Sequence, residues 1–425
     1  MLFIFSVFII MTLFLIKICT KDRIYRWFYY LMVIGFTIYS GVGIFTEAKE
    51  IEHNAFVYLI QFMLFLVFFM FGSIAVRKVR TYDYMPFLDD LTEKKFIYVM
   101  AAIYISTYVY CCIFSGVTFA QLINIQSLFT NYKATTFAVR VARRNNVLYN
   151  VITNQVASIS APFFYIALYN KRKNHRYFLA MYCLPILLAI LADGYISRNK
   201  IAVHIAFIYI YFCVERIIPK NFAKKIVLIA IPLMLFLFAV LQNIRSGNSS
   251  EIGFGDSIKD LILSEVEYPK YYDYCVRKSK EINTINFLIY IFIVWVPSQF
   301  YHYIGITVPN LAYSFTEAVI GLSYGETNNY YILLPSVLGE ALMLFGKYAA
   351  FLYGLIYGVF STWFLKVLKG HDCLYYLMIY YLLDFFRQFR GGSQYVISAW
   401  ETQIIPFILI IIIASIPYEK KRRRP

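Results

Sequence analysis

The chain has 425 residues, of which 60% are apolar and only 15% are charged. A soluble domain carries about 25% charged residues and could not bury this much apolar surface, so the composition excludes a cytosolic globular enzyme, a disordered chain and a disulfide scaffold. A polytopic membrane protein remains, and its formal net charge of +16 must be sorted by membrane side before it can indicate any partner.

Eleven apolar segments have the length of a membrane span, because about 20 apolar residues cross a hydrocarbon core of about 30 Å. They are 1–16, 27–45, 55–76, 96–115, 147–169, 177–193, 201–218, 226–243, 348–365, 373–389 and 403–418. The sequence therefore predicts an all-α polytopic membrane protein with about 11 transmembrane helices, forming a single integral membrane domain over 1–425.

Residues 287–307 are also apolar enough to cross the membrane, which would give 13 helices as the alternative. Prolines interrupt this run, and the stretch that would then be cytoplasmic, 308–331, holds no Lys or Arg. We therefore expect a large external loop region at 244–347 that dips into the membrane without crossing it. Such irregular backbone is tolerated at membrane depth only where protein or a water-filled cavity covers it.

Short basic loops alternate with the apolar segments. More than half of the 40 Lys and Arg residues lie in six of them: 17–26, 77–95, 171–176, 215–225, 366–372 and 420–424. Because Lys and Arg resist translocation, these loops are predicted to be cytoplasmic. The N-terminus then lies outside and the C-terminus inside.

Several arginines remain on the predicted external side, close to the ends of spans. They are Arg140, Arg143, Arg144, Arg198, Arg245, Arg387 and Arg390. A guanidinium group is a planar, permanently charged fork that binds phosphate oxygens in pairs, so these arginines are candidates to bind a lipid-linked phosphate or pyrophosphate. The structural alternative is that each one reaches toward anionic lipid headgroups.

Two residues are candidates for acid–base chemistry. Glu340 stands in the otherwise uncharged run LGEALMLFG, where a carboxylate is costly unless it is paired or faces water. Beside arginines it would stay ionised and could accept a proton from a sugar hydroxyl. His302, at the predicted outer face, is the second candidate. The structural alternatives are a Glu–Arg pair that fixes the fold and a histidine bonded to a backbone carbonyl.

The chain lacks the short motifs of nucleotide-binding loops, zinc proteases and serine hydrolases. It also has no Asp-x-Asp pair in a loop, the feature that would indicate metal-bound sugar-nucleotide chemistry. The sequence therefore predicts no metal, no cofactor and no nucleic-acid partner.

Taken together, these features resemble the O-antigen polymerases, also called Wzy-type oligosaccharide repeat-unit polymerases. Four stretches carry the resemblance: Arg198 in SRNK at the start of a span, Arg245 at the start of the large external loop, LGEALMLFG before a glycine-containing span, and the late FRGG. The resemblance implies a GT-C-like membrane enzyme of the bacterial inner membrane, with its active site and the 244–347 loop region facing the periplasm.

The resemblance further implies a metal-independent glycosyltransferase that polymerises undecaprenyl-pyrophosphate-linked repeat units of O-antigen or capsule-type polysaccharide. Arg198, Arg245 and Arg390 match the family's external arginines, and Glu340 matches its Gly-Glu position. Besides the lipid bilayer and the lipid-linked glycans, a chain-length regulator and a flippase are candidate partners. Two alternatives stay open: an O-antigen ligase using the same donor, and a non-enzymatic repeat-unit flippase.

Overall fold

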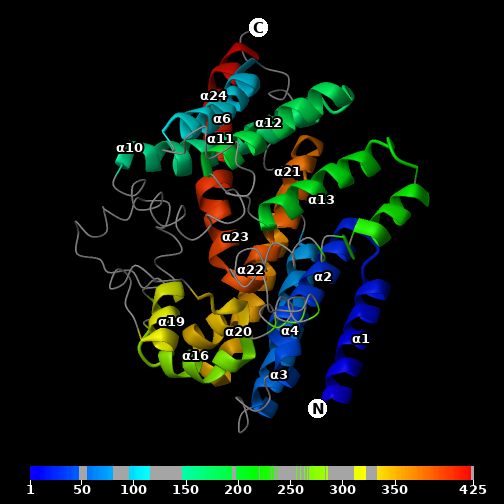
Figure 1. Ribbon diagram of the computed structural model, residues 1–425, viewed down its shortest axis with the longest axis vertical. Coiled ribbons are helices and arrows are strands. Elements are labelled where there is room, and N and C mark those ends of the chain that lie inside the picture. The colour runs from blue at the N-terminus through cyan, green and yellow to red at the C-terminus, as the bar shows by residue number, and fades with distance from the viewer. Residues whose placement is uncertain are drawn as a thin grey trace. The chain divides into compact units, whose positions relative to one another are not determined.

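Every regular element in the part of the chain that the structure describes is a helix (Figure 1). The structure is a computed structural model, and it describes residues 1–46, 55–79, 95–114, 146–193, 198–219, 221–230, 268–282, 311–321 and 333–422, with a few single positions between 232 and 285. The predicted all-α class is confirmed for these residues.

Eight of the described helices are long and apolar enough to cross a membrane. They are Leu2–Cys19, Arg23–Phe45, Ala55–Lys78, Lys95–Ile113, Val151–Asn170, His175–Ala192, Ser336–Lys369 and Val396–Ala414. Each corresponds to one of the eleven predicted spans, which supports a multi-pass membrane protein. The predicted span 201–218 is a shorter apolar helix, Lys200–Val214. The predicted span 226–243 falls mostly outside the described residues, as does 287–307.

The structure changes three predicted boundaries. The segment 373–389 is not one helix, because it consists of α21 (Tyr375–Asp384) and α22 (Phe386–Gly391) with a turn between them. The predicted external loop 390–402 is largely helical, with α23 (Gln394–Ala399) and the π-helical η5 (Trp400–Ile404). Within the predicted loop region 244–347, Leu311–Ile320 forms α19, and helix α20 (Ser336–Lys369) has already begun at 336.

The chain divides into two compact units: unit 1 comprises 1–82, 262–367 and 384–401, and unit 2 comprises 83–261, 368–383 and 402–425. Unit 1 contains α1 (Leu2–Cys19), α2 (Arg23–Phe36), η1 (Thr37–Val42), α3 (Gly43–Thr46), α4 (Ala55–Lys78), η3 (Tyr268–Tyr271), α16 (Tyr272–Lys278), α19, most of α20, α22 and α23. Unit 2 contains α6 (Lys95–Ile113), α10 (Val147–Asn150), η2 (Val151–Val156), α11 (Ala157–Asn170), α12 (His175–Asp193), α13 (Arg198–Val214), η4 (Asp372–Leu374), most of α21 and α24 (Ile405–Arg422).

Unit 2 is built around α11, whose residues 160–168 are all buried. Phe163 on this helix packs against Phe96 of α6, with ring centroids 5.3 Å apart, and against Phe407 of α24 at 4.9 Å. A helix that is apolar on all sides is stable only when other elements surround it, which explains the central place of α11 in unit 2.

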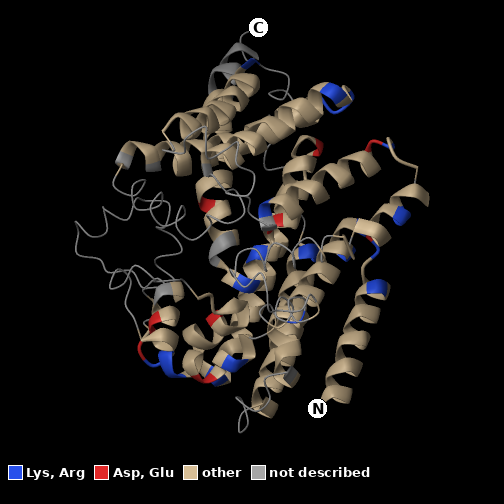
Figure 2. Ribbon diagram, viewed as in Figure 1, with Lys and Arg blue, Asp and Glu red and all other residues tan. Residues whose placement is uncertain are grey.

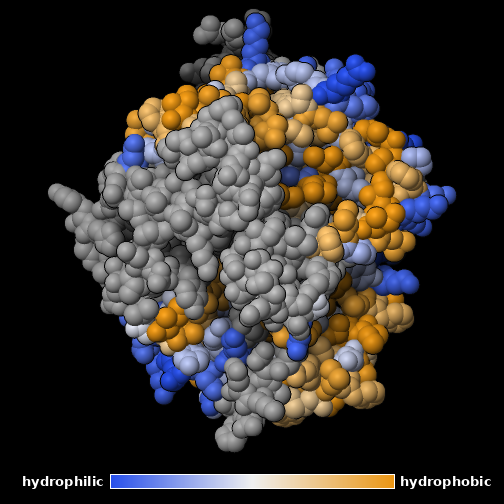
Figure 3. Space-filling view, in the orientation of Figure 1, coloured by the Kyte–Doolittle hydropathy of each residue, from blue (hydrophilic) through white to orange (hydrophobic). Residues whose placement is uncertain are grey.

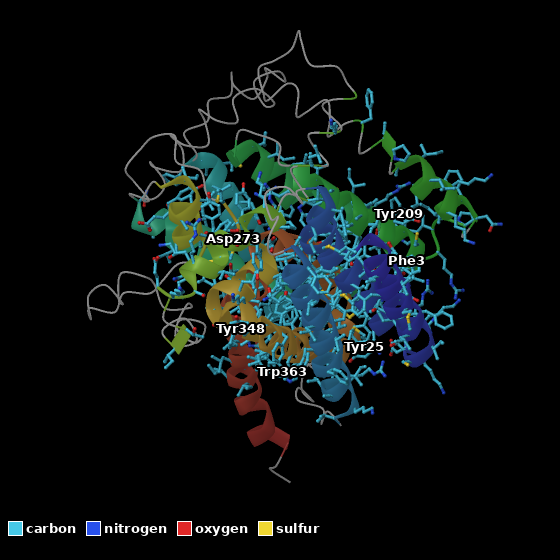
Figure 4. All side chains as sticks on the ribbon, turned by 90° about the horizontal axis from the view of Figure 1, so that it is seen from below. Phe3, Tyr25, Tyr209, Asp273, Tyr348 and Trp363 are labelled. Atoms are coloured by element: carbon cyan, nitrogen blue, oxygen red, sulfur yellow. The ribbon has the colours of Figure 1, made fainter. Side chains whose placement is uncertain are left out.

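Helix α1 has the opposite character, because its side chains are largely exposed. Leu2, Phe3 and Ile10 have exposed fractions of 60%, 79% and 66%. Figure 3 shows orange, hydrophobic atoms over the face of the molecule where Figure 1 places α1. Apolar side chains of this size would be costly in water, so α1 is suited to contact with lipid.

The centre of unit 1 is an aromatic cluster between α2, α4 and α22. The ring of Phe36 packs edge-on against Phe65 at 5.1 Å, Phe69 at 5.4 Å and Phe389 at 5.1 Å. Helix α2 begins where the Asp22 carboxylate caps it, accepting from the backbone N–H of residue 24 at 2.9 Å. This cap defines the first turn of the helix, and Phe36 is its last residue.

Helices α4 and α20 meet along a seam of glycines. A Cβ on Gly72 would lie 2.4 Å from the carbonyl oxygen of Leu355, and a Cβ on Gly358 would lie 2.1 Å from that of Phe69. Small residues allow this approach, which in a membrane supplies packing energy where the hydrophobic effect cannot. Gly354 and Gly358 of α20 therefore serve helix packing.

Gly358→Ala is expected to lower the free energy of unfolding by about 1–3 kcal/mol, because the added methyl group forces the two backbones apart. Thermal unfolding of the purified protein in detergent measures the effect. Ile356→Ala, which changes a 48%-exposed side chain on the same helix, is the control. An equal loss of stability in both variants would contradict the close approach of α4 and α20.

The basic ends of several helices meet in unit 1. Arg77, at the end of α4, donates to Thr20 Oγ1 at 3.2 Å, and Arg26 of α2 donates to the Thr20 carbonyl oxygen at 2.8 Å. Lys366, near the end of α20, donates to the Val76 carbonyl oxygen at 3.1 Å. Figure 2 shows basic residues at the end of α1 away from the N-terminus. The segment 17–26, the end of α4 and Lys366 near the end of α20 therefore lie together in unit 1.

Helix ends and loops that carry basic residues also meet within unit 2. Tyr211 donates to the carbonyl oxygen of Arg172 at 2.9 Å, and Tyr376 donates to Glu215 Oε1 at 2.8 Å. These bonds bring the loop 171–176, the end of α13 and the start of α21 together.

Candidate functional site

Glu340 lies one turn inside α20 and is 2% exposed. The helix begins at Ser336, a non-glycine residue with a φ of 62°, whose hydroxyl accepts from the backbone N–H of Gly339 at 3.2 Å. This start lies against α16, because the Sγ of Cys275 is 3.3 Å from the position that a Gly339 Cβ would take. Neighbouring elements therefore fix the turn that carries Glu340.

The Glu340 carboxylate is held by Ser393. Its Oε2 accepts from the Ser393 backbone N–H at 2.6 Å, and its Oε1 accepts from the Ser393 hydroxyl at 2.9 Å. The Tyr353 hydroxyl in turn donates to Ser393 Oγ. A chain of donors thus runs from Tyr353 through Ser393 to the carboxylate, and all three side chains are buried.

A glycine makes this contact possible. Gly392 has a φ of 86° and a ψ of 178°, a conformation that is essentially restricted to glycine. A Cβ at this position would lie 2.6 Å from Glu340 Oε2. The residue therefore supplies both the backbone turn and the space for the carboxylate.

Two of the predicted arginines lie in the helix that leads to this turn. Arg387 and Arg390 are half-buried residues of α22. The Nε of Arg387 pairs with Asp384 Oδ1 at 3.1 Å. The fold therefore brings the segment DFFRQFRGGS to Glu340, although in the described part of the chain the hydrogen bonds to this carboxylate come from Ser393 and none from an arginine.

The remaining predicted site residues cannot be assigned to this cluster. Arg140, Arg143, Arg144, Arg245 and His302 lie outside the described residues. Arg198 is the first residue of α13 in unit 2, and its side chain is also outside the described part. Their roles stay predictions.

Ser393 and Tyr353 are site residues that the sequence analysis missed. The pair Gly391–Gly392 just before Ser393 was the available signal, since two adjacent glycines permit a close approach of the backbone to another group. Tyr353 carried no local signal, because it is one of 40 tyrosines.

Metal-ligating side chains do not gather at this site. Among the residues described, no group of three or more His, Cys, Asp or Glu side chains is placed to hold a metal ion. All seven cysteines are free. The chemistry available at the cluster is that of one carboxylate and two hydroxyls, with Arg387 and Arg390 on the helix that leads to it.

Comparison of the chain with protein-family models, with curated proteins and with solved structures finds no match.

Proposed function

We propose that the protein is a glycosyltransferase that polymerises undecaprenyl-pyrophosphate-linked repeat units at the periplasmic face of the inner membrane, without a metal. The observation that carries the proposal is the contact between Glu340 and Ser393, residues 53 positions apart. This contact unites LGEALMLFG and FRGG, two separate stretches on which the resemblance to repeat-unit polymerases depends.

The location of Glu340 along α20 supports an outward-facing site. Lys366, at the other end of the helix, lies at the basic end of unit 1. The 20 residues from Gly346, where the helix is kinked, to Lys366 correspond to about 30 Å of helix, which matches the bilayer core of about 30 Å, and Glu340 lies beyond the kink. If the basic end is cytoplasmic, Glu340 lies near the opposite membrane face.

The residues at the cluster suit transfer from a diphosphate donor. In this reaction an acceptor hydroxyl attacks the anomeric carbon, the bond from that carbon to the pyrophosphate oxygen breaks, and the hydroxyl proton passes to a base. Glu340 is the proposed base, because Ser393 occupies only two of about four lone-pair positions on the carboxylate. Arg390 and Arg387 are proposed to stabilise the departing pyrophosphate by donating hydrogen bonds to its oxygens. Pyrophosphate is a stable anion, so it can leave without first taking up a proton.

Access to Glu340 requires a local movement, because its side chain is buried. The obstacle closest to the carboxylate is the backbone at Gly392 and Ser393. A shift of this turn would open one side of the carboxylate while leaving the aromatic cluster of unit 1 in place. The proposal therefore includes the Gly391–Ser393 turn as the element that moves when a glycan binds.

The test is an assay of the purified protein with a lipid-pyrophosphate-linked repeat unit, with and without a chelator. A ladder of elongated lipid-linked glycans that persists in the chelator is the expected result. Lack of elongation with transfer to a lipid A–core acceptor would instead identify the ligase alternative. Movement of the lipid-linked unit across vesicle membranes without elongation would identify the flippase.

Arg390→Ala is expected to reduce elongation by about 10²–10³-fold, because one donor to the leaving group is lost. Arg390→Lys is expected to recover only part of the rate, since an ammonium group cannot donate in parallel to two oxygens. The measurement is the rate of ladder formation at equal protein amounts. Arg176→Lys, an exposed change in a predicted cytoplasmic loop, is the control. Full activity of Arg390→Ala would remove Arg390 from the site.

A further inference from the structure

Helix α20 presents a line of hydroxyl groups to the interior of unit 1. After Tyr353 come Tyr357, Ser361 and Thr362, at spacings that place them along one side of a helix. All are buried, with exposed fractions of 3% or less. Tyr29 of α2, which is fully buried, lies beside Thr362. The hydroxyls thus extend from the Glu340 cluster toward the basic end of the unit.

The hydroxyl of Tyr357 and the side-chain oxygen of Gln388 have no hydrogen-bond partner within the described residues. The hydroxyls of Tyr29 and Thr362 lie close enough to interact with each other and have no further partner there. Each buried polar group left unpaired would cost about 1–3 kcal/mol. Buried water molecules are the usual partners of such groups.

The side chains that carry these oxygens are arranged in order along α2. Tyr357 lies level with Phe36, their ring centroids being 6.2 Å apart. One turn earlier, Met32 accepts from the Gln388 amide at 3.4 Å, and the next turn carries Tyr29. Gln388 therefore stands between Tyr357 on the outer side and the pair of Tyr29 and Thr362 on the inner side.

Both ends of the line reach ionisable groups. At the outer end, the ring of Tyr357 stacks on that of Tyr353 at 6.2 Å, and Tyr353 leads through Ser393 to Glu340. At the inner end, Tyr29 lies near Arg77 of the basic end. The buried rings of Phe36 and Phe69 flank Tyr357.

We propose that these hydroxyls and the water molecules they bind form a path along which protons pass between Glu340 and the basic end of unit 1. Each hydroxyl or water molecule accepts one proton and releases one, so no group is consumed and no co-reactant is needed. The path would carry protons across most of the membrane thickness. It stands independently of the proposed glycosyl transfer, because it depends only on the buried groups of unit 1.

The test uses the purified full-length protein in liposomes that contain a pH-sensitive dye. A potassium gradient with valinomycin drives protons inward, and the initial rate of acidification is compared with that of empty liposomes. We expect a protein-dependent proton flux that Tyr357→Phe and Thr362→Val each reduce about tenfold, since each removes about one hydrogen bond from the path. Tyr58→Phe is the matched control, because it removes a buried hydroxyl of unit 1 from outside the line.

A second measurement tests the water molecules directly. If Tyr357 is bound to water, Tyr357→Phe lowers the Tm; if its hydroxyl is unpaired, the same change removes a penalty and raises the Tm. No flux above that of empty liposomes, or an undiminished flux in both path variants, would overturn the proposal. A raised Tm in Tyr357→Phe would overturn the hydration on which it depends. These outcomes do not bear on the elongation assay, so the two proposals can fail separately.

Discussion

Glu340→Gln is expected to reduce glycan elongation by about 10²–10⁴-fold while the protein still folds and reaches the membrane. The amide has nearly the size of the carboxylate, and its oxygen can still accept a hydrogen bond from Ser393, but it cannot take a proton from an acceptor hydroxyl. Rates of ladder formation by the purified variant and the wild type measure the effect, and the Tm of each confirms that both are folded.

The matched control for this prediction is Glu401→Gln. Glu401 is also a buried glutamate of unit 1, with an exposed fraction of 4%, but it lies in η5 and is not bonded to Ser393. We expect this variant to elongate glycans at the wild-type rate. If Glu340→Gln is folded and fully active, Glu340 is a structural residue and the proposed reaction loses its base.

Gly392→Ala is expected to cost about 1–3 kcal/mol of stability through backbone strain alone, since its φ of 86° is not one that alanine adopts readily. The new Cβ would also meet Glu340 Oε2, 2.6 Å away, so the carboxylate must leave Ser393. We therefore expect elongation to be lost together with part of the stability. Thermal unfolding and the elongation assay on the same preparation separate the two effects.

Gly321→Ala introduces the same kind of backbone strain without a steric clash. Gly321 also has a positive φ, 75°, but no atom of the described residues lies within 4 Å of the position that its Cβ would take. This variant should therefore lose stability to a similar extent and keep its rate of elongation. If Gly392→Ala has no greater effect on elongation than Gly321→Ala, the Gly392 contact does not position Glu340.

The membrane helices were predictable because their signal is local. A run of about 20 apolar residues is sufficient to indicate a span, and eight of the predicted spans correspond to long apolar helices. The break at Phe385 was not predictable in this way, because DFFRQF contains neither proline nor glycine. The helical 394–404 segment was missed for the converse reason: polar residues such as Ser398, Glu401 and Gln403 lowered the apolar signal, although they lie on helices.

The candidate site was only half predictable. Glu340 was found because a carboxylate in an apolar run is costly wherever it lies. Its partner was not, since the bond to Ser393 joins residues 53 positions apart and neither side of it has a distinctive local pattern. The sequence favoured arginine as the partner on grounds of charge, whereas the fold supplies a serine presented by a glycine turn.

Gly346 divides α20 into two pieces, because its φ of 71° and ψ of 178° are not helical. The piece that follows Gly346 packs on α4 along the glycine seam. The piece that precedes it, which carries Glu340, is bonded elsewhere: Thr284 donates to the Leu344 carbonyl oxygen at 2.5 Å. Because the two pieces have separate attachments, the carboxylate can be repositioned without disturbing the packing of α4 on α20.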